Sequence, residues 1–157
     1  VEKHPPMRSV LRGILRELGL KKVDDVASTE SGFEEFNKKE PDIVLVDWAL
    51  NFDGIGLLNK IRTDTNSRNP FVPVIMVTAH SEVDRVIEAR DAGMTEYLAK
   101  PESAKKLYQR ISSIVDSKRQ FFRIAEFFGP DRRRKILGHA GDDRRGNSNG
   151  SKYAAEG

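Results

Sequence analysis

The chain of 157 residues contains no cysteine, so it can form neither a disulfide bond nor a thiolate metal site. It also has no unbroken apolar stretch as long as a bilayer span requires. The first residues lack the charged and apolar regions of a signal peptide. From these absences we expect a cytoplasmic protein without a membrane span.

Positive charge is concentrated at the end of the chain. Residues 1–117 contain 17 Lys and Arg against 19 Asp and Glu, and residues 118–157 hold the remaining 10 of 27 against the remaining 5 of 24. Binding to nucleic acid or to an acidic surface is therefore an alternative function of the tail, through the basic run 132–135. The other interpretations are a solubilising disordered tail and an extra helix over residues 121–128, packed on the domain or on a partner.

The composition divides the chain into three parts. Residues 1–118 carry alternating helix and strand patterns, and residues 119–137 form an aromatic and basic extension. Residues 138–157 are rich in Gly, Ser, Asn and charge, so we expect them to be disordered. No segment after residue 118 has a helix-turn-helix pattern of adequate length, so no DNA-binding output domain is expected.

Apolar spacing within residues 1–118 predicts an alternating α/β fold. Nearly continuous runs rich in β-branched residues predict buried parallel strands at Ile43–Val46 and Val72–Val77, and a shorter strand is expected at Val23–Ala27. Helical periodicity predicts five helices, at 7–18, 31–39, 55–61, 83–87 and 107–115. Strands that alternate with helices are typical of a doubly wound parallel sheet.

Three apolar runs end in polar residues that phosphoryl chemistry uses: Asp47, Thr78 and Lys100. If the runs are neighbouring parallel strands, their carboxyl ends share the edge where open α/β folds bind ligands. A carboxylate can form an aspartyl phosphate, a hydroxyl can donate to a phosphoryl oxygen, and an ammonium can pair with an anionic oxygen. Each residue alone is weak evidence, because a strand-end aspartate usually only contacts solvent or caps a helix, so the prediction depends on their coincidence.

Five motifs surround these residues and cover the chain from residue 1 to about 118. They are Asp42-Ile-Val-Leu-Val-Asp47-Trp48, Asp53-Gly54, Pro73-Val-Ile-Met-Val-Thr78-Ala79, Asp91-Ala-Gly93 and Lys100-Pro101. With them the chain resembles the receiver domains of two-component response regulators, in particular single-domain, chemotaxis-like receivers. The resemblance implies a flavodoxin-like sheet of order 2-1-3-4-5. No strand pattern precedes the first helix, so we expect the central strand to be truncated in this sequence, or the fold to be compromised.

The resemblance also implies a function. Asp47 would take a phosphoryl group from a histidine kinase or phosphotransfer protein with the help of Mg²⁺, and Thr78 and Lys100 would contact that group. The protein would be a signalling protein rather than an enzyme, with self-phosphorylation and dephosphorylation at Asp47 as its only chemistry. Phosphorylation would change a face that binds a downstream protein.

Further residues acquire roles only through the resemblance. Thr78 and Tyr97 would be the switch pair, although Tyr97 is equally an aromatic strand residue half packed at the surface. Ala49 and His80 would tune the lifetime of the phosphoryl group, and Lys100-Pro101 would be joined by a cis peptide bond.

The chain departs from the family at its expected metal site. Receivers usually carry two acids after the first strand, but here the pair is Glu2-Lys3. Mg²⁺ prefers oxygen ligands, so Glu2, Asp47 and the Ala49 carbonyl remain as candidates, weakened by Lys3. Alternatively, Lys3 pairs with Asp47 and replaces the charge of the metal, or Lys3 points into solvent. The rival hypothesis is a pseudo-receiver, an interaction module that takes no phosphate.

Overall fold

A parallel sheet of three strands lies at the centre of the computed structural model, which describes residues 1–79, 83–100, 103–116, 121–124 and 127–130. The strands are β1 (Val44–Asp47), β2 (Val74–Thr78) and β3 (Glu96–Ala99), in the spatial order β1-β2-β3. The register pairs Asp47 with Val77 and Thr78 with Ala99. All three strands therefore end at the same edge of the sheet.

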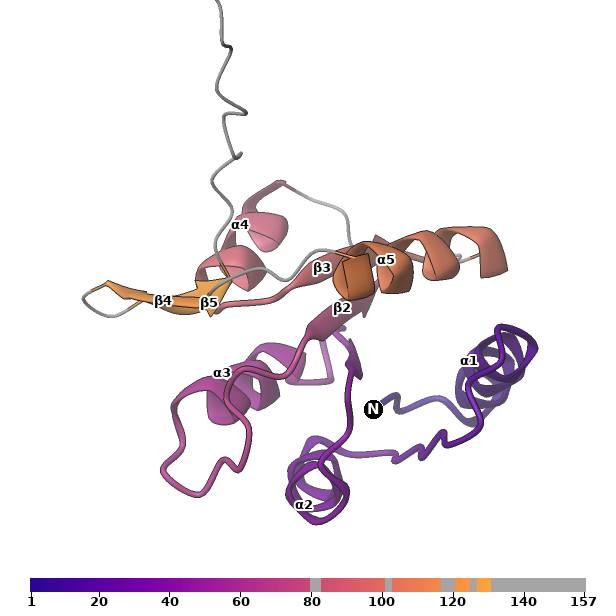
Figure 1. Ribbon diagram of the computed structural model, residues 1–157, viewed down its shortest axis with the longest axis horizontal. Coiled ribbons are helices and arrows are strands. Elements are labelled where there is room, and N and C mark those ends of the chain that lie inside the picture. Colours follow the sequence, from indigo (N-terminus) through magenta and orange to yellow (C-terminus); the bar gives the residue numbers. More distant parts are fainter. Residues whose placement is uncertain (80–82, 101–102, 117–120, 125–126, 131–157) are drawn as a thin grey trace, which may run out of the picture.

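Helices cover both faces of this sheet (Figure 1). They are α1 (Pro5–Glu17), α2 (Thr29–Lys39), α3 (Gly54–Thr63), α4 (Val83–Asp91) and α5 (Ala104–Asp116). Local sequence explains their ends: two prolines open α1, Gly19 follows it at a φ of 88°, and the Ser28 hydroxyl caps α2 by accepting from the Ser31 N–H.

The core has two layers because successive strand residues point to opposite faces. Val46 and Met76 pack with residues of α2, α3 and α4, such as Phe36 and Leu58. Ile75 and Val77 pack on the other face with residues of α1 and α5, such as Leu11, Leu15 and Leu107. The predicted doubly wound α/β fold and all five predicted helices are confirmed.

The strand predicted at Val23–Ala27 is wrong, since no strand forms over these residues. Among the backbone groups of the described residues, only the Glu2 N–H bonds to this segment, donating to the Val26 carbonyl at 3.1 Å, so no ladder of hydrogen bonds holds a strand there. Val1 in turn lies beside β1, with its nitrogen 2.8 Å from the Leu45 carbonyl and its carbonyl 2.9 Å from the Asp47 nitrogen. Val1 and Glu2 thus lie between Val26 and β1, where the order 2-1-3-4-5 places the first strand, although the strands that form in this sheet are β1, β2 and β3.

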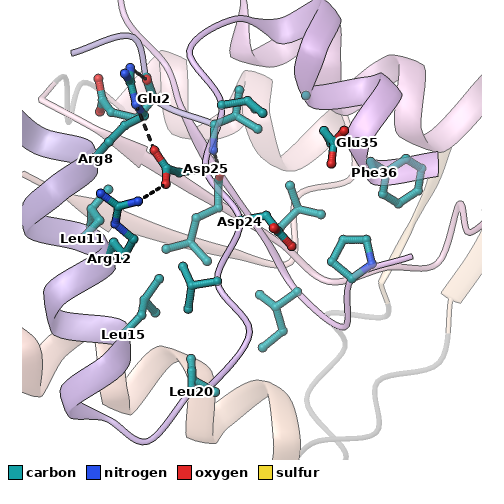
Figure 2. A pocket seen from close by; sticks show the side chains of 18 of the residues that line it. Glu2, Arg8, Leu11, Arg12, Leu15, Leu20, Asp24, Asp25, Glu35 and Phe36 are labelled. Atoms are coloured by element: carbon teal, nitrogen blue, oxygen red, sulfur yellow. Dashed lines mark hydrogen bonds and ion pairs between the residues drawn. The ribbon is translucent and has the colours of Figure 1, made fainter. Parts of the chain in front are cut away.

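A hollow of about 190 Å³ lies between α1, the segment after it and β1. Figure 2 shows Leu11, Leu15 and Leu20 at its apolar part, and Arg8, Arg12 and Asp25 at one side. The hollow extends along the sheet as far as Glu2 and Asp47.

The described part of the aromatic extension forms an antiparallel hairpin, β4 (Phe121–Ile124) and β5 (Phe127–Pro130), and not an extra helix. The hairpin lies on the side of α3 and α4 in Figure 1. The ring of Phe128 meets that of Phe71 edge to face, with 5.3 Å between centroids. Consecutive aromatic residues favour a pleated, half-covered strand, which explains the difference.

Residues 131–157 lie outside the described residues, so the basic run 132–135 and the predicted disordered tail stay untested. Within the described part of the chain, no helix has the length and hydropathy to cross a membrane.

Candidate functional site

The three polar residues predicted from the strand ends lie together at the carboxyl edge of the sheet. Asp47 ends β1, Thr78 ends β2 and Lys100 follows β3. The Lys100 ammonium lies 2.7 Å from Oδ1 of Asp47, and its backbone N–H donates to the Thr78 carbonyl at 2.8 Å. Asp47 is 3% exposed, so this ion pair is largely shielded from water.

Glu2 completes a triad with these two charges. Its Oε2 lies 2.6 Å from the same Lys100 ammonium, and its Oε1 accepts the His4 N–H at 2.9 Å. One ammonium therefore holds two buried carboxylates, and Lys100 itself is only 14% exposed. The two acids thus share one cation at the strand ends.

Contacts within the triad change the pKa values of two of its members. Burial opposes the charged form of Glu2, but hydrogen bonds from Lys100 and the His4 N–H, with the charge of Lys100, outweigh burial and lower the pKa of the Glu2 carboxyl. Burial likewise opposes the charge of Lys100. Its hydrogen bonds to Asp47 and Glu2, and their negative charges, nevertheless raise the pKa of Lys100. Both groups are therefore charged at neutral pH.

Thr78 is fully buried, and its hydroxyl donates to the Trp48 carbonyl at 2.6 Å. This bond ties the end of β2 to the residue after Asp47. Tyr97 is half-buried in β3, opposite Met76, and packs against the core. Its ring is therefore neither fully inside nor free in solvent.

The loop after Asp47 is short and closely packed. Ala49 and Phe52 form an isolated bridge, in which the Ala49 carbonyl accepts the Phe52 N–H at 3.0 Å. Asp53 then caps α3 by accepting the Gly56 N–H at 2.8 Å. A Cβ at Gly54 would collide with the Asp47 carbonyl, so only glycine permits this close return of the chain.

Lys3 is exposed, and the cation that pairs with Asp47 is Lys100. The interpretation in which Lys3 neutralises Asp47 is therefore wrong for this structure, and the solvent-facing alternative is the one observed. Glu2, the other half of the pair, is the residue that reaches the site.

The oxygen atoms at this site are of the kind that Mg²⁺ prefers, but few side chains supply them. Glu2 and Asp47 are hard oxygen ligands that share one cation, and the Ala49 carbonyl belongs to the adjoining loop. Among the described residues, no group of three or more His, Asp or Glu side chains is placed to hold a metal ion. A metal here would depend on two carboxylates, a carbonyl and water, which Mg²⁺ accepts because it commonly keeps several waters.

Two predicted positions cannot be placed, because His80 and Pro101 lie outside the described residues. Two arginines were missed. The Arg85 guanidinium on α4 lies 5.0 Å from the ring centroid of Trp48, and Arg8 on α1 contacts the backbone of Glu2. Neither carries a sequence signal, since isolated helix arginines are common at the surface.

Comparison with known proteins agrees with this geometry. The family model described as the response regulator receiver domain matches residues 1–112. The chain is 30% identical to the chemotaxis protein CheY-3 of Vibrio cholerae, over 74% of this chain and 88% of the relative. It is also 30% identical to the chemotaxis protein CheY of Pseudomonas aeruginosa, over 74% and 93%.

Solved structures give the same result. A putative response regulator from Chloroflexus aurantiacus aligns with a TM-score of 0.66 at 27% identity, covering 74% of this chain and 94% of that one. The receiver domain of the sensor histidine kinase PA1611 from Pseudomonas aeruginosa aligns with a TM-score of 0.64 at 30% identity, with the same coverage. That structure has a magnesium ion coordinated in its active site cleft.

Proposed function

Because the chain belongs to the response regulator receiver domain family, we propose that Asp47 accepts a phosphoryl group from a histidine kinase or phosphotransfer protein in the cytoplasm. The observation that carries this proposal is the contact between Asp47 and Lys100 at the strand ends, with Thr78 on the next strand. A carboxylate beside a lysine and a hydroxyl is suited to accept and hold an anionic group.

In the proposed reaction a carboxylate oxygen of Asp47 attacks phosphorus, the new O–P bond forms, and the P–N bond of the donor phosphohistidine breaks. The imidazole leaves with the electron pair of that bond and takes up a proton. Oδ2 of Asp47 has no hydrogen-bond partner among the described residues, whereas Oδ1 is held by Lys100, so Oδ2 is the proposed nucleophile. Lys100 then pairs with the phosphoryl oxygens.

Glu2, Asp47 and the Ala49 carbonyl are the proposed ligands of Mg²⁺, which when bound supplies positive charge against the phosphoryl oxygens. Lys3 weakens this set, because its exposed side chain adds no oxygen ligand and its positive charge next to Glu2 opposes the binding of a cation.

The proposed output is a change in the protein-binding face formed by α4, β3 and α5. Thr78 would leave the Trp48 carbonyl for a phosphoryl oxygen, and half-buried Tyr97 would turn inward, so that a downstream protein binds one state better. The downstream protein is not identified by these residues.

The test is phosphorylation by a small phosphodonor such as acetyl phosphate, with and without Mg²⁺. We expect wild type to incorporate phosphate with Mg²⁺ present and Asp47→Asn to incorporate none, because the amide is not a nucleophile of this kind. Mass spectrometry of the intact protein measures the label. A matching far-UV circular dichroism spectrum controls for the fold of Asp47→Asn.

Lys3→Asp replaces an exposed positive charge next to Glu2 with a negative one, so it should lower the Mg²⁺ concentration needed for half-maximal labelling. Lys105→Asp, an exposed position on α5, makes the same charge change and should leave that concentration unchanged. A wild type that stays unlabelled under all these conditions would contradict the proposal and favour a pseudo-receiver.

A further inference from the structure

The bend that brings Glu2 into the site is held by a side chain that the proposed chemistry does not use. Arg8 on α1 donates from Nη1 to the carbonyl oxygens of both Glu2, at 2.8 Å, and Lys3, at 2.9 Å. Its Nε donates to Oδ2 of Asp25 at 3.1 Å. In Figure 2, Arg8 extends from α1 with Asp25 on one side and Glu2 on the other.

Asp25 also contacts a second arginine. Arg12, one helical turn after Arg8, donates from Nη1 to Oδ1 of Asp25 at 2.9 Å. The next residue, Val26, accepts the Glu2 N–H through its carbonyl. The backbone of Glu2 is thus held at its N–H by Val26 and at its carbonyl by Arg8.

These contacts determine where the side chains of Glu2 and Lys3 lie. In an extended strand, successive carbonyl groups point in opposite directions, so two that meet one guanidinium require a bend. The chain is bent at Lys3, the Glu2 side chain is buried, and the Lys3 side chain is exposed. Buried Glu2 then contacts Lys100, which contacts Asp47.

We propose that Arg8 is a positioning residue for phosphoryl transfer: by holding the carbonyl oxygens of Glu2 and Lys3, it keeps the Glu2 carboxylate and the Lys100 ammonium beside Asp47. This inference rests on the proposed function of Asp47. The planar guanidinium fork is needed because it reaches two carbonyls and a carboxylate at once.

The test compares the rate of phosphorylation by acetyl phosphate in Arg8→Met and Arg12→Met. We expect Arg8→Met to be slower by about tenfold, because small displacements of positioned groups cost rate steeply. Arg12→Met removes an ion pair to the same Asp25 from the same helix but no contact with Glu2 or Lys3, so its rate should stay within about twofold of wild type. Arg8→Lys, which keeps the charge but not the fork, should fall between wild type and Arg8→Met. If Arg8→Met fails to fold, Arg8→Lys carries the comparison.

A double mutant distinguishes positioning from general stability. If Arg8 acts through Glu2, then Arg8→Met should change the rate less than about twofold in a Glu2→Gln background, since coupled residues are not additive. An equal loss in both backgrounds, or a wild-type rate in Arg8→Met, would overturn the role of Arg8 while leaving Asp47 as the acceptor. An unlabelled wild type would instead overturn the proposed function, and the role of Arg8 with it.

Discussion

Lys100 is the residue on which the electrostatics of the site depend. It holds two buried carboxylates, Glu2 at 2.6 Å and Asp47 at 2.7 Å. Without the ammonium, two negative charges would face each other in a site of low polarity. No cation would then offset the free-energy cost of burying the two carboxylates. The triad is therefore stable only as a unit.

Replacing Lys100 with Met should destabilise the protein by about 3–5 kcal/mol at neutral pH, the usual cost of leaving a buried charge unpaired. Urea unfolding measures the change. Lys105→Met, at an exposed position of α5, is the matched control and should stay within about 0.5 kcal/mol of wild type. A loss as small as that of the control would mean that water solvates the triad.

Sequence could predict Asp47, Thr78 and Lys100 because strand ends of a parallel sheet meet at one edge. It could not decide between Glu2 and Lys3, because the direction of these side chains is set by a bend whose cause, Arg8, lies in the following helix. Neither residue belongs to a periodic pattern, so no spacing argument applies to them.

At the scale of the elements, the β4–β5 hairpin makes contacts with the domain that no sequence pattern predicts. Phe128 packs on Phe71, and a Cβ at Gly93 would collide with the Phe128 carbonyl. Arg62 on α3, buried beside them, donates to the carbonyls of Gly93 and Pro70. Burial lowers the pKa of Arg62 to about 9, which still leaves the guanidinium charged at neutral pH. The hairpin therefore packs against the domain through two contacts: the close approach of its backbone to Gly93 and the ring contact between Phe128 and Phe71.

Alanine substitutions at two glycines can distinguish the cost of backbone strain from the cost of a collision with the hairpin. Gly93 and Gly19 have φ values of 89° and 88°, so alanine at either should cost about 1–2 kcal/mol. Nothing lies within 4 Å of a Cβ at Gly19, whereas Gly93→Ala also meets the hairpin and should cost about 1–3 kcal/mol more. Urea unfolding of the two variants measures the difference, and equal losses would mean that the hairpin leaves this position in solution.

Helices and strands were predicted correctly where the sequence pattern lies within the element itself. The predictions failed where the structure depends on contacts with other segments. Apolar periodicity, Pro5 and Pro6 at the start of the helix and Gly19 after its end predict α1. The segment Val23–Ala27 has apolar residues at both ends, but among the described residues it makes only one backbone hydrogen bond, from Glu2 to Val26, so it forms no strand. The hairpin was missed because aromatic residues suit a packed helix as well as a strand.

At the scale of the whole molecule, the triad joins the N-terminal segment, β1 and the residue after β3. Its charges therefore contribute to global stability in a defined pH range. The pKa of Glu2 is lowered on folding, so its contribution is complete above the ordinary value of 4.5 and is lost as the pH falls through the lower folded-state value. The pKa of Lys100 is raised, so its contribution is complete below 10.5 and is lost as the pH rises through the higher folded-state value.

We therefore expect the contribution of the triad to be constant between about pH 4.5 and 10.5 and to fall outside that range. In Lys100→Met the pH dependence at acidic pH should have the opposite sign. Without the ammonium, the two facing carboxylates repel each other, which raises the pKa of Glu2 in the folded variant, so this variant gains stability as the pH falls. Thermal unfolding of both proteins from pH 4 to 7 measures the two slopes. Parallel curves would contradict the assignment of the charges.

Trp48 is the only tryptophan of the chain, and it directly follows Asp47. Its carbonyl binds Thr78, and its indole ring lies under the Arg85 guanidinium of α4. All indole emission from this protein therefore originates between Asp47, the proposed phosphorylation site, and the helix whose face is proposed to change. The molecule carries an intrinsic optical probe at that junction, so occupancy of the site can be followed in real time without attaching a dye.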